Sequence, residues 1–361
     1  MSAPILMMAG GTGGHVYPAL AVANALRDRG HEVEWVGTSR GLEQRVVPAA
    51  DIKLHHLAVR GVRGKGLLDK LQSLLALGFA SVQALWLVLR LRPAAVVGMG
   101  GYVAGPAGVA AWLLRRPLLI HEQNAVAGTT NRMLQPLADV VVTGFPGAFK
   151  SDVEAIALGN PVREDIVALG EAQHYDYDGK RSLHVLVLGG SLGAKPLNET
   201  VPEAVSKLLE EGVDLRVWHQ TGEAHVGPVS HAYPADHANV RVAPFIENMA
   251  EAYAWADVVI CRAGALTVAE LAVMARPAIL VPLPHAIDDH QTANARSLAD
   301  RGGAILLRQA DMSVAALMQS LRGYLNHPER LRAMSAAARA VAAPDATARV
   351  TDRCEELFRD K

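Results

Sequence analysis

Residues 5–26 read ILMMAGGTGGHVYPALAVANAL. The run from Ile5 to Ala9 is short and apolar and ends in glycines, whereas the residues after Pro18 have the apolar spacing of a helix. This order predicts a strand, a glycine-rich loop and a helix, which together form the first step of a parallel α/β sheet.

The same alternation of strand-like runs and helix-length segments fills the rest of the chain. It restarts at VLVLGGSLG, residues 185–193, and a helix is expected from near Pro196. We therefore predict an α/β protein with two Rossmann-like parallel-sheet domains. The other strand-like runs are Val33 to Val36, Ala95 to Val97, Leu118 to Ile120, Val140 to Val142, Leu215 to Trp218, Val240 to Val242, Val258 to Cys261, Ala278 to Val281 and Ala304 to Leu307.

The domain boundary is expected at Gly159-Asn160-Pro161, a turn-forming cluster suited to a hinge. The predicted domains are residues 1–160 and 161–344, and a chain of 361 residues is long enough for two cores. Sheets of this kind bind ligands outside the carboxyl ends of their strands. We therefore expect the active site in an interdomain cleft.

Composition and charge narrow the class of protein. Half of the residues are hydrophobic, and 35 Lys and Arg balance 36 Asp and Glu, so no general attraction to nucleic acid is expected. The chain has two cysteines, Cys261 and Cys354, and its first residues lack the basic region of a signal peptide. These features favour the cytoplasm.

One stretch bears on a membrane-spanning alternative. The residues from Leu71 to Leu89 carry no charge and are nearly numerous enough to cross a bilayer. The stretch contains Gln72, Gln83 and several small residues, and it lies between two strand-like segments. We therefore predict a helix of the fold.

The loop Gly10-Gly11-Thr12-Gly13-Gly14-His15 is suited to an anion. Glycines let backbone amides approach a ligand closely, and the helix that follows directs its positive dipole end toward the same place. Four glycines exceed what a tight turn needs, so phosphate recognition is favoured over a turn without a ligand. A dinucleotide fingerprint fits less well, because Val16 stands where the third glycine is required.

The second glycine-rich loop, Gly189-Gly190-Ser191-Leu192-Gly193, repeats this pattern. The Ser191 hydroxyl can donate to an anion beside the backbone amides. Two such loops facing one cleft suit an acceptor diphosphate and a donor diphosphate.

Five motifs follow one another along nearly the whole chain. They are Gly11-Thr12-Gly13-Gly14-His15, Gly98-Met99-Gly100-Gly101-Tyr102, His121-Glu122-Gln123-Asn124, Gly159-Asn160-Pro161-Val162-Arg163 and the run CRAGALTVAE, residues 261–270. In this order they resemble the MurG family, the N-acetylglucosaminyltransferases that convert lipid I to lipid II of the bacterial cell wall. The resemblance implies a GT-B fold with UDP-N-acetylglucosamine (UDP-GlcNAc) held mainly by the second domain. It also implies a final helix, within residues 345–361, that packs back on the first domain.

The resemblance assigns donor contacts to individual residues. Glu270 is expected to accept hydrogen bonds from both ribose hydroxyls, although by itself it is equally an ordinary first-turn glutamate. Ile246 is expected beside the uracil and Arg163 facing the donor diphosphate. Asn124 and Gln291 are expected near the sugar hydroxyls. The other residues expected to bind the donor are Thr12, Gly13, Gly14, Ser191, Ala265, Leu266, Thr267, Val268 and Ala269.

The implied reaction is an inverting single displacement. The 4-hydroxyl of N-acetylmuramic acid in lipid I attacks the anomeric carbon of UDP-GlcNAc, and the products are β-1,4-linked lipid II and UDP. His15 is the first candidate for the general base, since histidine has a reference pKa of about 6.5. Alternatively, His15 binds the acceptor diphosphate together with the loop that begins at Gly11. Glu122 is the alternative candidate for the base. Many relatives have glutamine in place of Leu192, which we therefore leave out of the site.

No cofactor and no metal site are predicted. Asp288 and Asp289 are adjacent in a loop and do not form an Asp-x-Asp pair. The spacing of the histidines between residues 219 and 237 lacks the compact pairs of a structural zinc site.

The acceptor lies in a membrane, so the resemblance places the chain peripherally on the cytoplasmic face of the inner membrane. A segment with basic and apolar residues suits contact with anionic phospholipid, although its apolar residues are equally suited to the domain core. We name as the membrane patch Arg60, Arg63, Lys65, Leu67, Leu68, Lys70, Leu75, Phe79 and Trp86. Contacts with other cell-wall enzymes stay open.

Two alternatives remain. A UDP-GlcNAc hydrolase or epimerase can share the fold and the donor, and a non-catalytic membrane module can sense a sugar nucleotide. The basic and apolar segment after Arg60, together with His15, Glu122 and Asn124, favours the transferase.

Overall fold

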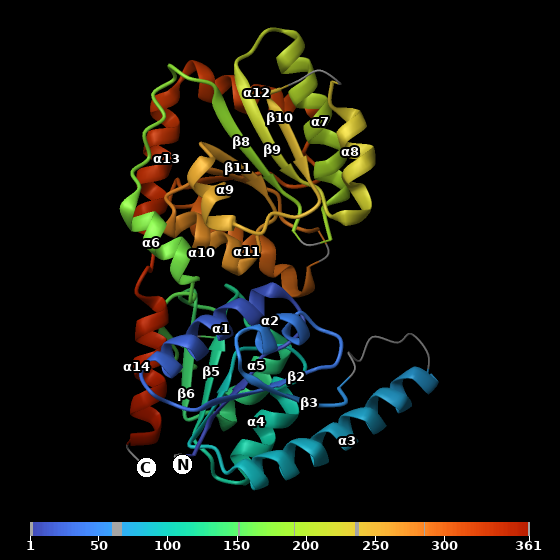
Figure 1. Cartoon of the computed structure of the whole chain (residues 1–361), viewed down its shortest axis with the longest axis vertical. Coiled ribbons are helices and arrows are strands. Elements are labelled where there is room, and N and C mark those ends of the chain that lie inside the picture. The colour runs from blue at the N-terminus through green and yellow to red at the C-terminus, as the bar shows by residue number, and fades with distance from the viewer. Residues whose placement is uncertain are drawn as a thin grey trace. The chain divides into compact units, whose positions relative to one another are not determined.

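The computed structural model describes residues 3–59, 67–150, 152–190, 192–234, 238–284 and 286–359, with the side chains of residues 67–74 and 287 left out. Its contacts divide the chain into a first unit, Met1–Arg163 with Pro344–Lys361, and a second unit, Glu164–Ala343. Each unit contains one parallel sheet (Figure 1). The predicted class, two parallel-sheet α/β domains, is confirmed.

The first sheet has the strand order β3-β2-β1-β4-β5-β6-β7. Its strands are β1 Ile5–Met8, β2 Val33–Gly37, β3 Lys53–His56, β4 Ala95–Gly98, β5 Leu118–Glu122, β6 Val140–Thr143 and β7 Ile156–Ala157. Its helices are α1 Gly13–Asp28, α2 Glu43–Ala49, α3 Leu67–Leu91, α4 Ala104–Leu113, α5 Thr129–Leu134, the 3-10 helix η1 Gln135–Leu137 and α14 Ala346–Arg359. Helix α3 confirms the helix predicted over residues 71–89.

The second sheet has the strand order β10-β9-β8-β11-β12-β13. Its strands are β8 Leu183–Leu188, β9 Leu215–Gln220, β10 Val240–Ala243, β11 Val258–Cys261, β12 Ala278–Leu280 and β13 Ala304–Leu306. Its helices are α6 Glu164–Ala172, α7 Lys195–Glu210, α8 Val226–Ala232, α9 Met249–Trp255, α10 Ala265–Val273, α11 His290–Ala299, α12 Val314–Asn326 and α13 Pro328–Ala340, with the 3-10 helices η2 Glu223–His225 and η3 Ile287–Asp289.

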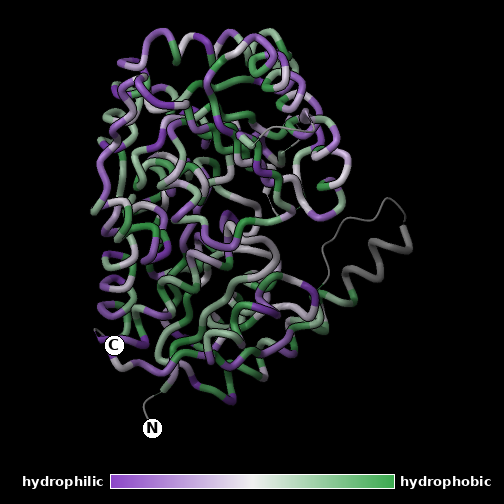
Figure 2. The backbone as a smooth tube through the Cα atoms, turned by 45° about the horizontal axis from the view of Figure 1, so that its top comes forward, coloured by the Kyte–Doolittle hydropathy of each residue, from purple (hydrophilic) through white to green (hydrophobic). Residues whose placement is uncertain are grey.

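Both faces of the first sheet are buried, which explains why β1 is apolar at every position. Ile5 and Met7 face a core shared with α1 and α14, whereas Leu6 and Met8 face a core shared with α3 and α4. In Figure 2, hydrophobic colour is common on the inner parts of the backbone and hydrophilic colour on much of the outer backbone.

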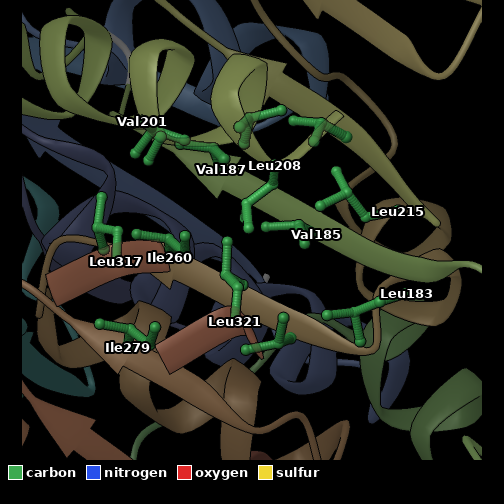
Figure 3. Packing of buried hydrophobic residues seen from close by; sticks show 14 of the residues in the cluster. Leu183, Val185, Val187, Val201, Leu208, Leu215, Ile260, Ile279, Leu317 and Leu321 are labelled. Atoms are coloured by element: carbon green, nitrogen blue, oxygen red, sulfur yellow. The ribbon is translucent and has the colours of Figure 1, made fainter. Parts of the chain in front are cut away.

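The core of the second unit follows the same rule. Figure 3 shows Val185 and Val187 of β8 beneath Val201 and Leu208 of α7, and α12 contributes Leu317 to the same cluster. Helices α7 and α12 also contact each other. Burial of each such aliphatic side chain contributes about 1.5–3 kcal/mol, so this layer holds β8, and the loop that follows it, firmly in place.

Two strands are absent from the sequence-based prediction. Strand β3, with the sequence KLHH, pairs with β2 at one edge of the first sheet, and β7, with two residues, pairs with β6 at the other. An edge strand needs only one buried face, so it can contain polar residues. Such a strand lacks the apolar run by which the other strands are predicted. Among the described helices, none has both the length and the apolar character needed to cross a membrane.

Helix α14 joins the first unit although it follows the whole second unit in sequence. It buries Val350, Cys354 and Leu357 and contacts α1 (Figure 1). On its polar side, Glu355 accepts a hydrogen bond from His31 Nε2 at 2.8 Å. This hydrogen bond holds the pKa of Glu355 below its ordinary value, with nearby arginines adding to the effect.

We predict that Glu355→Gln lowers the free energy of unfolding at pH 7 by about 1–2 kcal/mol, since a partly buried charge-assisted hydrogen bond is lost. A carboxylate with a lowered pKa stabilises the folded state above its unfolded pKa, and this contribution disappears as the pH falls through the folded value. The variant should therefore lose less stability than the wild type below about pH 4.5. Chemical denaturation at several pH values tests this, with exposed Glu356→Gln as the control. Equal pH dependence of wild type and Glu355→Gln would contradict it.

Candidate functional site

The first glycine-rich loop joins β1 to α1 in a conformation that exposes backbone amides. Gly11 has φ +97°, which a residue with a Cβ atom rarely adopts. Val16 N donates to Thr12 O at 3.2 Å, and the amides of Gly13 and Gly14 precede this first full helical bond. Amides at the start of a sixteen-residue helix form a site for an anion such as phosphate.

A buried carboxylate that sequence reasoning missed fixes this loop from behind. Glu43 Oε2 accepts from Gly11 N at 2.9 Å, and Oε1 accepts from Thr38 N and Oγ1, each at 2.8 Å. A Cβ atom on Gly37 or Gly41 would lie 2.6 or 1.9 Å from side-chain atoms of Glu43. The glycines around an acidic residue at the start of α2 are the signal that could have found it.

The loop after β4 packs directly on the first loop. Gly100 and Gly101 have φ +90° and +84°. A Cβ atom on Gly101 would lie 2.5 Å from the carbonyl oxygen of Gly10, and one on Gly100 would lie 2.7 Å from Nδ1 of His15. The glycines of this second motif therefore make room for the first loop and for the imidazole.

His15 belongs to a chain of hydrogen bonds that runs into the sheet. Its Nδ1 lies 2.9 Å from Oε1 of Gln123, whose Nε2 lies 3.2 Å from Nδ1 of His121. His121 Nε2 lies 3.0 Å from the carbonyl oxygen of Gly159. His121 is fully buried, and desolvation lowers its pKa to about 4. His121 is therefore neutral at physiological pH.

Glu122 is also buried, and four donors surround its carboxylate. Oε1 accepts from N and Nδ2 of Asn124 at 2.9 and 3.0 Å, and Oε2 accepts from Gly128 N and Asn131 Nδ2, each at 2.9 Å. This arrangement orders the turn between β5 and α5. It also holds the amide of Asn124.

Arg163 ends the first of the two segments that form the first unit, and its side chain approaches α1. Its Cζ is 5.3 Å from the ring centroid of Tyr17, two residues beyond His15 on α1. The first unit thus carries many of the predicted site residues, at the carboxyl ends of β1 and β5 and at the end of its first segment: Gly11, Thr12, Gly13, Gly14, His15, Glu122, Asn124 and Arg163.

The glycine-rich loop of the second unit follows β8. Gly190 and Gly193 have φ +78° and +77°, and a Cβ atom on Gly193 would lie 1.9 Å from the carbonyl oxygen of Thr221. Leu192 is 86% exposed, so its side chain does not build this loop. Ser191, predicted to bind the donor, lies outside the described residues.

Helix α10 of the second unit presents its N-terminus in the same way. Gly264 caps it in an extended conformation, and Val268 N makes the first full helical bond to Gly264 O at 3.0 Å. The amides of Ala265, Leu266 and Thr267 precede that bond. They belong to residues predicted from the motif, and amides at the start of a helix can bind an anion.

The remaining donor candidates lie on loops and helices of the second unit. Glu270 is buried, and its Oε2 accepts from the Tyr253 hydroxyl at 2.9 Å. Ile246 is buried, with 3% of the residue exposed. Gln291 Oε1 accepts from Leu283 N at 2.9 Å and braces the loop before α11.

The described residues contain no group of three or more His, Cys, Asp and Glu side chains that could hold a metal ion. Asp288 and Asp289 are both exposed and have φ +54° and +51°. Two consecutive non-glycine residues in this region store backbone strain, which is typical of ligand-binding loops.

An exposed apolar surface covers part of α3 and α4. Leu75, Phe79 and Trp86 are 67%, 57% and 57% exposed. Helix α4, which packs against α3, adds exposed Trp112 and Leu113, which sequence reasoning missed. Of the other predicted patch residues, Arg60, Arg63 and Lys65 lie outside the described residues, as do the side chains of Leu67, Leu68 and Lys70.

Comparisons with known proteins agree along the whole chain. Residues 5–143 match the glycosyltransferase family 28 N-terminal domain, and residues 184–350 match its C-terminal domain. The chain is 52% identical over 363 residues to the UDP-N-acetylglucosamine--N-acetylmuramyl-(pentapeptide) pyrophosphoryl-undecaprenol N-acetylglucosamine transferase of Alkalilimnicola ehrlichii, covering 99% of this chain and 100% of that one. It is 50% identical to the protein of the same name from Stutzerimonas stutzeri, with 99% of each chain covered. The crystal structure of Acinetobacter baumannii MurG has a TM-score of 0.80 and 42% identity, covering 98% of this chain and 100% of that one.

We predict that Gly101→Ala destabilises the first unit more than Gly147→Ala does. Both glycines have positive φ, which costs about 1–2 kcal/mol for an L-residue. No atom lies within 4 Å of a Cβ on Gly147, whereas a Cβ on Gly101 meets the backbone of Gly10. The clash should add about 1–3 kcal/mol. Denaturant unfolding of both variants measures the difference, and equal losses would show that the two loops can separate freely.

Proposed function

The chain belongs to glycosyltransferase family 28, and on that premise we propose that it transfers N-acetylglucosamine from UDP-GlcNAc to the 4-hydroxyl of N-acetylmuramic acid in lipid I. The products are lipid II and UDP. The observation that carries the proposal is identity of about half over almost the full length of transferases with this activity in their names. The two helix N-termini described above, one in each unit, give the chemistry that two diphosphate-bearing substrates require.

We propose His15 as the general base. Its ring lies at the glycine-rich loop, where an acceptor diphosphate would be bound by the amides of α1. Glu122 is the weaker candidate, because its two carboxylate oxygens already accept from four donors. The acceptor hydroxyl gives its proton to His15 Nε2 as its oxygen attacks the anomeric carbon, and the bond to UDP breaks in the same step.

The donor is proposed to lie along the second unit. The amides of Ala265, Leu266 and Thr267 stabilise the charge that develops on the departing diphosphate. Glu270, held by the Tyr253 hydroxyl, accepts from the ribose hydroxyls. Also proposed for donor contacts are Thr12, Gly13, Gly14, Asn124, Arg163, Ser191, Ile246, Val268, Ala269 and Gln291.

The lipid acceptor requires the enzyme to work at a membrane surface. We propose that the exposed apolar residues of α3 and α4 enter the interface at the cytoplasmic face of the inner membrane. Arg90 lies with its Cζ 5.2 Å from the Trp86 ring centroid, so a cation borders the apolar surface where anionic headgroups would lie.

The transfer assay is the central test. Purified protein is incubated with UDP-GlcNAc and a short-tailed lipid I analogue in the presence of a chelator, and disaccharide and UDP are measured together. We expect both products in equal amounts, and we expect His15→Ala to lower kcat by about 10²–10⁴-fold. Exposed His174→Ala is the matched control.

Each other outcome has a defined meaning. UDP without disaccharide would indicate a hydrolase or epimerase, and binding without turnover would indicate a sensing module. Activity that appears only with magnesium would contradict the stabilisation of the leaving group by amides alone. Full activity of His15→Ala would eliminate it as the base.

Membrane contact predicts a loss of vesicle binding in the double variant Phe79→Ser/Trp86→Ser. Removing two exposed aromatic side chains from an interface should weaken partitioning by about tenfold to a hundredfold. Co-sedimentation with vesicles containing anionic phospholipid measures this. The control Ile305→Ser/Val341→Ser removes two partly exposed apolar residues of the second unit. An equal loss in both double variants would argue against a specific surface on α3.

A further inference from the structure

The Gly159 carbonyl determines which atom donates and which accepts in each hydrogen bond of the chain from His15 to Gly159. The carbonyl oxygen of Gly159 can only accept, so His121 Nε2, 3.0 Å away, must carry a proton. Burial keeps His121 neutral, because it lowers the pKa to about 4. A neutral imidazole protonated on Nε2 has a lone pair on Nδ1.

That lone pair orients the next side chain. The atom of Gln123 that lies 3.2 Å from His121 Nδ1 must be the amide nitrogen, since two acceptors would repel each other. The same nitrogen lies 3.3 Å from the carbonyl oxygen of His121, a second acceptor. Oε1 of Gln123 is therefore the atom that faces His15 Nδ1 at 2.9 Å.

We propose that Gln123, oriented by His121 and the Gly159 carbonyl, is a positioning residue that holds His15 in its Nδ1–H tautomer and leaves Nε2 as the proton acceptor. The inference rests on the base role proposed above for His15. In the opposite tautomer, Nε2 would carry a proton and could not accept one from a substrate hydroxyl. The hydrogen bond to Gln123 thus selects the form of the imidazole that can act as a base.

The surroundings keep Gln123 in place. It is 1% exposed, and its backbone carbonyl accepts from Asn160 Nδ2 at 3.0 Å. A Cβ atom on Gly144 would lie 2.2 Å from Oδ1 of Asn160, so glycine is needed there for Asn160 to reach Gln123. The Asn160 of the predicted hinge motif therefore supports the same chain of bonds.

A neutral amide suits this position better than a carboxylate. Glutamate at residue 123 would accept from His15 Nδ1 equally well, but its charge would stabilise the imidazolium and raise the pKa of the ring by about 1–3 units. A larger fraction of the ring would then be protonated and unable to accept a proton. The other titratable side chains on the surrounding elements, unchanged in every variant below, include Tyr17, Glu43, Tyr102, His121, Glu122 and Arg163.

The first test observes the tautomer directly and needs no activity. Protein labelled with ¹⁵N in its histidines is examined at neutral pH by NMR correlation of the ring nitrogens with the ring carbon-bound protons. The resonances lost in His15→Ala identify that ring. We expect a protonated Nδ1 and an unprotonated Nε2, and the opposite pattern would overturn the proposal.

The second test separates positioning from structure. Gln123→Met should lower kcat by about 10–100-fold with little change in the KM for UDP-GlcNAc, since only the supply of the correct tautomer is affected. Gln123→Glu should move the acid limb of the kcat/KM pH profile upward by about 1 unit or more, with activity recovering at alkaline pH. Gln173→Met, which removes a partly buried glutamine bonded to Arg276, is the control and should leave kcat unchanged.

The outcomes test the positioning role of Gln123 and the base role of His15 separately. Wild-type kcat in folded Gln123→Met, or an unmoved acid limb in Gln123→Glu, would overturn the positioning role. If Gln123→Met fails to fold, the tautomer and the Gln123→Glu profile decide. Full activity of His15→Ala would instead refute the base role of the proposed function, whatever tautomer the NMR measurement finds.

Discussion

The carbonyl oxygen of Gly10 lies so close to Gly101 that no Cβ atom fits between the two loops. This approach joins the carboxyl ends of β1 and β4, and the rest of the first site depends on it. It sets the start of α1, and therefore the direction of the amides of Gly13 and Gly14. The neighbouring Gly100 leaves the space that the imidazole of His15 occupies. Because packed backbone cannot yield as a flexible side chain can, the loop geometry is fixed before any ligand arrives.

Both units combine a glycine-rich loop with a buried neutral histidine. In the first, His121 orients Gln123, and in the second, His219 lies 3.1 Å from Oδ1 of Asn198, whose Nδ2 donates to the Thr221 carbonyl beneath Gly193. Burial lowers the pKa of His219 to about 3, so it too is neutral. A neutral histidine donates one hydrogen bond and accepts another. It can therefore orient a neighbouring amide side chain without placing a charge in the core.

The sequence predicts the fold well where burial on both faces makes a strand uniformly apolar, as in β1 and β8. It misses β3, whose polar residues lie at an edge. Within the site, the glycine loops and His15 are predictable because their chemistry is local. Glu43 and Gln123 are not, because each acts on a residue far away in sequence: 32 positions separate Glu43 from Gly11, and 108 separate Gln123 from His15. Trp112 and Leu113 escape notice for a related reason, since their exposure depends on how α4 packs against α3.

The position of α14 has a consequence for the order in which the protein folds during synthesis. The second unit is continuous in sequence, whereas the first receives Val350, Cys354 and Leu357 from a helix made after it. Ala346, the first residue of that helix, follows Arg163 by 183 positions. At roughly 5–20 residues per second the ribosome needs about 10–40 s to make this stretch. Throughout that interval the nascent first sheet exposes the apolar strip that α14 later covers. The first unit is therefore begun first and completed last. Chaperones that bind exposed apolar surface have the longest time to act on this unit.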